Sequence, residues 1–229
     1  MSTIPLPPPL LTLSGISKHY RVGDCEVPAL RQVDLSVPAG AFMAVRGPSG
    51  SGKTTLLNIC GLIDDFDAGE YHLNGEPVSR LKESERTLLR RSTIGFIFQS
   101  YNLIPVMTVR ENVEYPLLLA GMPAAARRAK VDAILQGVGL AQREHHRPDL
   151  LSGGQRQRVA IARALVKAPR LVIADEPTAN LDTATASQII DLMRALGRQQ
   201  GVTFLIATHD ERMSAHCNYR CSLTDGVLQ

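Results

Sequence analysis

The sequence lacks a marked excess of charge, since 25 Lys and Arg residues stand against 22 Asp and Glu residues in a chain of 229. This balance predicts no nucleic-acid partner, which a basic stripe would favour. No apolar run approaches the roughly 18 residues of a membrane-spanning helix, so we expect that the chain does not cross a membrane by itself. Residues 1–9 lack the basic segment and apolar core of a signal peptide, and their prolines favour a flexible arm.

Cysteine is also scarce, and the four cysteines are scattered at positions 25, 60, 217 and 221. Only Cys217 and Cys221 are close in sequence, with His216 beside them. A metal site would need better-spaced ligands, so reduced thiols of a cytosolic protein are the simpler expectation. The hydrophobic content of 44% is that of an ordinary globular protein. We therefore predict one domain over residues 10–229.

The most informative stretch is Gly-Pro-Ser-Gly-Ser-Gly-Lys-Thr at residues 47–54, which matches the phosphate-binding pattern G-x-x-x-x-G-K-[ST]. The apolar run 41–45 before it predicts a buried strand, and residues 55–59 begin a helix. Glycines let successive N–H groups face one anion, and the helix N-terminus adds partial positive charge. Lys53 would then reach the β- and γ-phosphates of a nucleotide, and Thr54 would ligate Mg²⁺. A chance Gly/Ser turn would not have a strand and a helix on its two sides.

Four polar side chains lie at the ends of three predicted strands further along the chain. The run Leu171-Val172-Ile173-Ala174 leads into Asp175 and Glu176, and ligands bind at the carboxyl ends of such strands. Asp175 would hold Mg²⁺ through water, and Glu176 could polarise an attacking water. Gln99 follows the strand-like run 94–98, and His209 follows the run 202–208. The alternatives are an ordinary strand followed by an N-capped helix at Asp175–Glu176 and a structural role for His209.

Residues 10–46 alternate apolar and polar side chains and predict β structure. Tyr20 stands alone in a polar part of this segment, where it could stack on an adenine ring or be an ordinary surface tyrosine. Asn74-Gly75 predicts a hairpin turn. Between residues 100 and 150 the pattern becomes helical, with a Thr108 capping box. The apolar cluster 103–107 precedes that helix and could be core or a docking surface for a partner.

The segment Leu-Ser-Gly-Gly-Gln at residues 151–155, called here the signature segment, opens another helix, predicted over residues 155–168 with Ser152 as its N-cap. A serine and two glycines at a helix N-terminus form a second candidate anion site. An ordinary capped helix start is the alternative.

With the phosphate loop, Gln99, the signature segment, Asp175–Glu176, the segment 180–182 and His209 in this order, the chain resembles the ATP-binding cassette ATPases over nearly its whole length. The signature segment upstream of Asp175–Glu176 is the specific element, since other phosphate-loop NTPases lack it. The resemblance implies an α/β fold: a phosphate-loop NTPase (RecA-like) core, an N-terminal antiparallel β-subdomain, and a helical subdomain inserted at about residues 100–165.

The resemblance also implies roles for individual residues. Lys53, Gln99, Glu176 and His209 would be catalytic, with Glu176 as the general base and His209 as a γ-phosphate contact. Mg²⁺ would be held by Thr54, Gln99 and Asp175. The residues implied in ATP binding are Tyr20, Gly47, Pro48, Ser49, Gly50, Ser51, Gly52, Lys53, Thr54, Thr55, Gln99, Ser152, Gly153, Gly154, Gln155, Asp175, Glu176, Asp182 and His209.

In this family two cassettes pair head to tail, so that Ser152 and Gly154 of one would close on the ATP held by the other, with Asp182 communicating across the interface. The phrases Tyr101-Asn102-Leu103-Ile104-Pro105 and Glu111-Asn112-Val113-Glu114 look like those of the lipoprotein-releasing and macrolide-exporter group. Arg46 and the tail 213–220 depart from the family pattern.

This resemblance implies a homodimer that hydrolyses ATP at the cytoplasmic face of the inner membrane. It would power a separate permease that exports or extracts a cell-envelope substrate, namely a lipoprotein, lipid, peptide or drug. The alternative is an ATPase module of a non-transport complex of the cell-division or mechanical signalling type. Cassettes that act on ribosomes or DNA usually carry tandem cassettes or a coiled-coil insert, which this sequence does not show.

Overall fold

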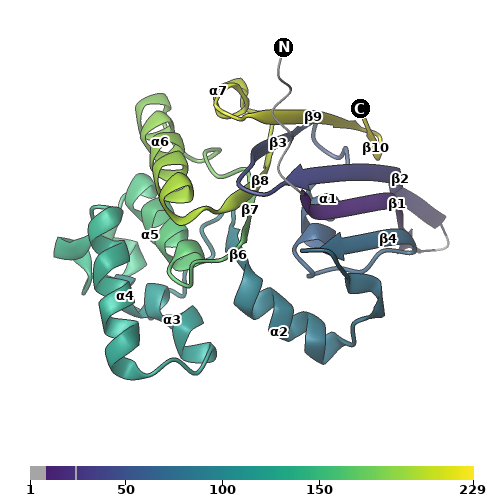
Figure 1. Cartoon of the computed structure of the whole chain (residues 1–229). Helices are drawn as coiled ribbons and strands as arrows, with labels where there is room; N and C mark the ends of the chain where they lie inside the picture. Colours follow the sequence, from purple (N-terminus) through teal and green to yellow (C-terminus); the bar gives the residue numbers. More distant parts are fainter. Residues whose placement is uncertain (1–8, 24) are drawn as a thin grey trace, which may run out of the picture.

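The computed structural model describes residues 9–23 and 25–229. Residues 1–8 of the predicted N-terminal arm lie outside the described residues. Two β-sheets and seven α-helices make up the described part of the chain (Figure 1).

The first sheet is antiparallel and has the strand order β2-β1-β4-β5. Its strands are β1 (Pro9–Val22), β2 (Cys25–Pro38), β4 (Ala68–Leu73) and β5 (Glu76–Pro77). The alternating residues of the sequence explain its one buried face, since Leu11, Leu13 and Val33 are buried. Asn74 and Gly75 form the predicted turn between β4 and β5, both with positive φ. The predicted hairpin is confirmed.

The second sheet has the order β10-β9-β3-β8-β7-β6 and is parallel except for the terminal β9–β10 hairpin. Its strands are β3 (Phe42–Arg46), β6 (Ile94–Ile97), β7 (Leu171–Asp175), β8 (Thr203–Thr208), β9 (Tyr219–Thr224) and β10 (Val227–Leu228). Both faces of its central strands are buried, which is why β7 and β8 read as uninterrupted apolar runs. Because the strands are parallel, their carboxyl ends meet at one edge.

The helices divide between the two faces of the parallel sheet. They are α1 (Lys53–Cys60), α2 (Glu83–Thr93), α3 (Val109–Leu119), α4 (Ala124–Gly137), α5 (Gly153–Leu165), α6 (Thr183–Gln200) and α7 (Glu211–Ala215). One buried core joins α3, α4, α5 and α6 to one face, and the other joins α1 and the antiparallel sheet to the opposite face. In Figure 1, α3 and α4 stand well away from the antiparallel sheet. The predicted α/β fold with its β and helical parts is confirmed.

The helix starts follow the predicted capping residues. Thr108 and Ser152 each form a capping box, with N–H groups bonded to their hydroxyls and a Glu or Gln side chain returning to the cap N–H. The helix expected over residues 155–168 was predicted too long, because α5 ends at Leu165. Ala168 adopts a positive φ of 51° before Pro169, and a residue that precedes proline is disfavoured in the helical region.

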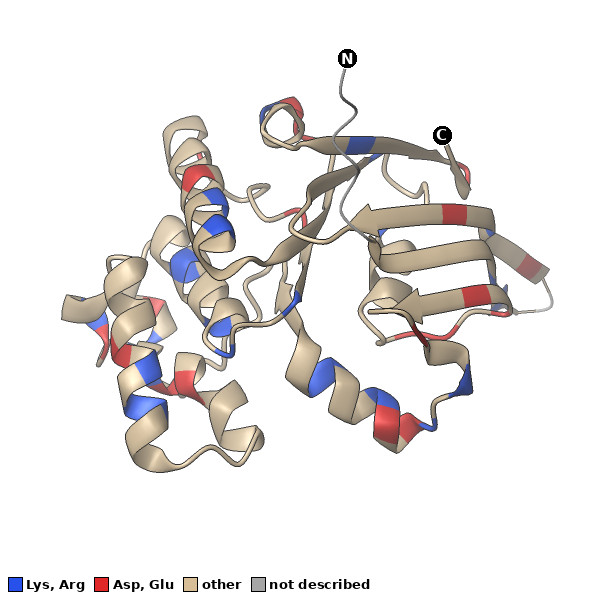
Figure 2. Ribbon diagram, viewed as in Figure 1, with Lys and Arg blue, Asp and Glu red and all other residues tan. Residues whose placement is uncertain are grey.

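No helix among the described residues combines the length and the apolar character needed to cross a bilayer. Acidic residues stand in the first turn of α2 and basic residues in its last turn, and α4 also carries residues of both signs (Figure 2). Several of them pair within the helical region, such as Arg127 with Glu114, whose closest atoms are 2.6 Å apart.

Candidate functional site

A cavity of about 650 Å³ lies at the carboxyl edge of the parallel sheet. It collects residues that are far apart in the sequence, because β3, β6, β7 and β8 all end there. Its lining consists of Tyr20, Val27, Pro28, Ala29, Ser49, Gly50, Gly52, Lys53, Thr54, Thr55, Gln99, Asp175, Glu176 and His209. Most of the residues predicted to bind ATP within one chain therefore surround one space.

The phosphate loop joins β3 to α1, and two of its glycines lie where a side chain would clash with neighbouring main chain. Gly52 has a φ of 102° and is the N-cap of α1. A Cβ on Gly52 would lie 2.5 Å from the carbonyl oxygen of Ala29, and one on Gly47 would lie 2.2 Å from that of Leu223. Only glycine fits these positions without displacing main chain. The helix N-terminus is consequently brought to the floor of the cavity, where its N–H groups favour an anion.

Lys53 bends back over the loop. Its ammonium donates hydrogen bonds of 2.8 Å to the carbonyl oxygens of Gly47 and Pro48, and the residue is only 9% exposed. The buried hydroxyl oxygen of Ser51 makes no hydrogen bond. A phosphate in the cavity would thus meet a fixed positive charge above a loop of main-chain N–H groups, which is the chemistry that anion cradles use.

Thr54 and Asp175 place two oxygen donors side by side. The Thr54 hydroxyl donates a 3.0 Å hydrogen bond to the Asp175 carboxylate. Burial raises the pKa of Asp175, and the neighbouring Glu176 adds to this, whereas the Thr54 hydrogen bond opposes it. A divalent cation would offset the cost of burying the charged Asp175 carboxylate. A hydroxyl with one carboxylate is a set of ligands that Mg²⁺ accepts when phosphates and water complete its coordination shell. These residues therefore fit a Mg²⁺–nucleotide.

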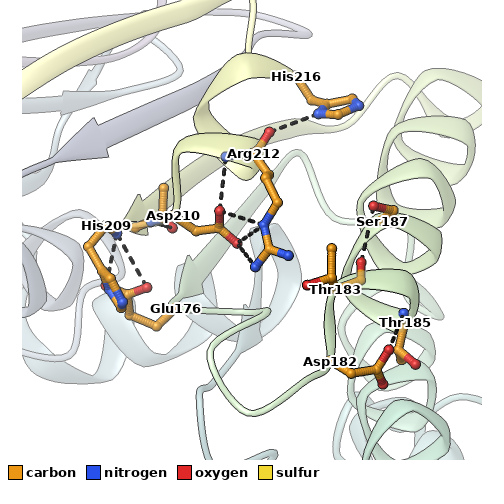
Figure 3. A network of polar contacts seen from close by, with 10 residues as sticks. Glu176, Asp182, Thr183, Thr185, Ser187, His209, Asp210, Arg212 and His216 are labelled. Atoms are coloured by element: carbon orange, nitrogen blue, oxygen red, sulfur yellow. Dashed lines mark hydrogen bonds and ion pairs between the residues drawn. The ribbon is translucent and has the colours of Figure 1, made fainter.

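Glu176 and His209 face each other at the ends of β7 and β8 (Figure 3). The His209 Nδ1 lies 2.7 Å from a Glu176 carboxylate oxygen, and the His209 main-chain N–H donates to the same carboxylate at 3.2 Å. The Glu176 side chain is 13% exposed, and the imidazole is 69% exposed. When Nδ1–H donates to Glu176, Nε2 can donate to a phosphate only if the ring is protonated. Protonation would therefore decide whether His209 can bind an anion.

Tyr20 stands at the rim, on the β1–β2 hairpin opposite Val27. Its hydroxyl donates a 2.5 Å hydrogen bond to Asp64, and the Lys18 ammonium lies 5.3 Å from its ring centroid. Burial, followed by the Asp64 hydrogen bond, raises the pKa of the Tyr20 hydroxyl. The phenol is thus anchored at one end while the ring stays 38% exposed at the cavity, an arrangement that suits stacking on a flat base.

The signature segment and Asp182 do not line this cavity. Ser152 caps α5, and Asp182 caps α6 by accepting a 3.0 Å hydrogen bond from the Thr185 N–H. A Cβ on Gly154 would lie 2.5 Å from the Thr185 methyl carbon, so the two helix starts pack closely. The five predicted residues Ser152, Gly153, Gly154, Gln155 and Asp182 hence form a second group, separate from the cavity within one chain.

Two contributions were missed by reasoning from the sequence. Val27, Pro28 and Ala29 line the cavity because pairing of β1 with β2 places Val27 opposite Tyr20 and Pro28 opposite His19, and no local pattern signals this. Asn180 donates a 2.9 Å hydrogen bond to the main-chain oxygen of Gln99. The atypical Arg46 pairs with the exposed Glu211 at 3.3 Å, two residues beyond His209.

A phosphate loop between a parallel strand and a helix, with a Thr–Asp oxygen pair at the sheet edge, defines a phosphate-loop NTPase. A family model described as ABC transporter matches residues 30–179. The chain belongs to this family and is an ATP-hydrolysing cassette.

Relatives with similar sequences carry export or release names. The macrolide export ATP-binding/permease protein MacB of Marinobacter nauticus is 47% identical across 97% of this chain, which spans about a third (34%) of that relative's length. The lipoprotein-releasing system ATP-binding protein LolD of Anaeromyxobacter dehalogenans is 47% identical over 98% of this chain and 94% of its own. The cassette MJ0796, solved as a dimer in a post-hydrolysis state with ADP and Pi, superposes with a TM-score of 0.88, at 38% identity over 96% of both chains.

Proposed function

We propose that this cassette binds Mg²⁺–ATP and, as a head-to-tail homodimer, drives a membrane permease that exports or extracts a cell-envelope substrate. The observation that carries the proposal is the separation of the two anion sites. The phosphate loop lines the cavity, but the signature segment lies outside it. A second copy arranged head to tail would supply the missing signature segment to each nucleotide. The dimeric state of MJ0796 supports this arrangement.

Hydrolysis is assigned to the residues at the carboxyl edge. Lys53 would hold the β- and γ-phosphates, while Thr54, Asp175 and Gln99 would hold Mg²⁺, which supplies charge neutralisation when bound. Glu176 would accept a proton from the attacking water, because its carboxylate lies at the cavity edge and is largely shielded from solvent. His209 would orient Glu176 through the 2.7 Å contact and donate to the γ-phosphate when protonated.

The surface for the permease is proposed at the loop 103–107 that follows Gln99. Within it, Leu103 packs against the core, whereas Val106 is 74% exposed. The fully buried Asn112 holds the loop, since its amide accepts from the Ile104 N–H at 2.8 Å and donates to the Met107 oxygen at 3.1 Å. An exposed apolar side chain on a loop that is rigidly supported is suited to docking. Its position next to Gln99 would link docking to the nucleotide.

The test is affinity capture with a variant that binds ATP without turning it over. Glu176→Gln would be incubated with ATP and detergent-solubilised membranes, and co-purifying proteins would be identified. The matched control is Glu176→Gln combined with Val106→Asp, which leaves the cavity intact and places a charge on the proposed docking loop. Recovery of a polytopic permease by the first variant and not by the second is expected. Recovery of a division or signalling protein instead would favour the non-transport alternative.

A further inference from the structure

The turn that follows Gln99 has a main-chain conformation that its sequence does not favour. Tyr101 and Asn102 are consecutive non-glycine residues with φ values of 64° and 46°. Such left-handed residues typically cost about 1–3 kcal/mol each unless surrounding structure holds them. The turn's own hydrogen bonds, from Tyr101 N–H to Phe98 and from Asn102 N–H to Ser100, are short-range. Something outside the turn has to hold it.

Arg163, on α5, supplies that support. Its guanidinium donates two hydrogen bonds, one of 2.7 Å to the carbonyl oxygen of Tyr101 and one of 2.5 Å to that of Asn102. Both acceptors are main-chain carbonyl oxygens of successive residues. The planar guanidinium therefore constrains the orientation of both peptide groups. Burial lowers the pKa of Arg163, but a guanidinium stays protonated in proteins. The side chain is therefore a charged fork that fits this one turn.

The same helix touches the turn near its N-terminus as well. The Arg156 guanidinium lies 5.2 Å from the centroid of the Tyr101 ring, and a Cβ on Gly153 would lie 3.1 Å from the Tyr101 hydroxyl. Gly153 belongs to the signature segment and lies roughly 15 Å along the helix from Arg163. The turn is thus fixed to α5 along much of the helix.

The turn is also tied to the cavity on its other side. Gln99 lines the cavity two residues before Tyr101. Its main-chain oxygen accepts the 2.9 Å hydrogen bond from Asn180, which lies in the segment leading to Asp182. A displacement of α5 would thus reach Gln99 through Arg163 and only two intervening residues.

We propose that Arg163 is a positioning residue for ATP hydrolysis: it fixes the turn after Gln99 to α5, so that Gln99 and the signature segment of one chain move as one unit. The proposal rests on the role proposed above for Gln99 in holding Mg²⁺. It does not depend on a permease, so the capture experiment and the experiments below can fail independently.

The first test compares turnover by the purified chain in two backgrounds. Arg163→Met is expected to lower kcat about tenfold while the ATP dissociation constant changes less than twofold, and Arg163→Lys is expected to lie between. In the Gln99→Ala background the same Arg163→Met change is expected to alter kcat less than twofold, because residues that act through one another are not additive. An equal fold-change in both backgrounds, or a raised KM with unchanged kcat, would overturn the proposal.

The control is Lys167→Met, one helical turn from Arg163. The Lys167 ammonium donates to the carbonyl of Arg91 at 2.7 Å and does not contact the turn. This variant removes a partly buried cation two residues beyond the end of α5, and its kcat is expected to stay within twofold of the wild-type value. A tenfold loss of kcat in Lys167→Met would show that the effect of Arg163→Met comes from a general loss of stability around α5, and would contradict the proposal.

The second test needs no turnover and follows hydrogen exchange of residues 98–104 in Glu176→Gln with and without Mg²⁺–ATP. With Arg163 present, nucleotide is expected to slow exchange in this segment. In the Arg163→Met variant, exchange without nucleotide is expected to rise several-fold and the protection by nucleotide to be largely lost. Unchanged exchange and protection in that variant would show that Arg163 does not hold the turn.

Discussion

The two anion sites of this chain are built from the same parts but differ in how complete they are. At the phosphate loop, a glycine-rich helix start is joined by a lysine, a Thr–Asp oxygen pair and a Glu–His pair around one cavity. At the signature segment, a similar glycine-rich helix start has its own capping box, a close contact between Gly154 and Thr185, and the Tyr101 hydroxyl near Gly153. The first proposed site has the groups to hold a ligand within one chain, whereas the second would need another surface to complete it.

The difference follows from topology. The phosphate loop leaves a central strand of the parallel sheet, so the ends of β6, β7 and β8 deliver their polar residues to it. The signature segment enters a helix from the loop after the short turn at Pro148–Leu150 and has no strand end beside it. A helix N-terminus alone binds anions weakly. Completion by a second molecule is therefore the simplest way for it to act on a nucleotide.

The largest expected effect comes from removing the proposed base of the complete site. Glu176→Gln should lower the rate of phosphate release at least about 100-fold, since a lost general base typically costs 10²–10⁴ in rate. ATP affinity should remain within about twofold, and an ATP-bound dimer should accumulate in light scattering. Glu211→Gln is the control, because this exposed acid lies outside the cavity. Wild-type turnover in Glu176→Gln would refute the assignment.

The incomplete site is tested by Ser152→Arg. A long cation in place of the N-cap should block a second copy from approaching, so ATP-dependent dimers should be lost while ATP binding by the monomer stays within about twofold. Ser152→Ala removes only the cap, at about 1 kcal/mol of stability, and should still dimerise. Light scattering of both variants in the Glu176→Gln background gives the answer. An undiminished ATP-dependent dimer in Ser152→Arg would contradict the head-to-tail arrangement.

A smaller effect is expected at the rim of the complete site. Tyr20→Ala should weaken ATP binding about 5- to 150-fold, because base stacking on an aromatic ring contributes about 1–3 kcal/mol. GTP should be weakened similarly, since stacking tolerates either base. Tyr20→Phe removes only the hydroxyl that donates to Asp64 and should bind nearly as the wild type. Equal affinities for Tyr20→Ala and the wild type in a nucleotide titration would exclude stacking.

The smallest effect concerns Lys167, which lies just beyond the end of α5. Burial lowers the pKa of Lys167 to about 8, so between pH 8 and 10.5 the unfolded chain binds more protons than the folded one. The contribution of Lys167 to stability consequently rises with pH in that window. Relative to Lys167→Met, the wild type should gain about 2 kcal/mol of unfolding free energy between pH 7 and 10. Denaturant unfolding at the two pH values measures this, and a pH-independent difference would contradict it.

Local signals were sufficient for many of the elements. The Thr108 and Ser152 capping boxes, the Asn74–Gly75 turn and the apolar run before Asp175 each depend on a few adjacent residues. The end of α5 was misplaced because Pro169 acts on the residues before it more strongly than the apolar periodicity of 155–168 suggested.

Local patterns in the sequence were enough to predict the phosphate loop and the strand-end positions of Gln99, Asp175, Glu176 and His209. They were also enough to indicate the family, because each motif is made of a few adjacent residues with a local physical role. Which of these residues line one cavity depends on the tertiary structure and could not be predicted from these local patterns. Strand order brings β3, β6, β7 and β8 to one edge, and hairpin pairing adds Pro28 and Ala29. Likewise, the contact of Arg163 with the turn after Gln99 joins residues about 60 positions apart. Contacts over such separations are set by packing between elements, and no short pattern encodes them.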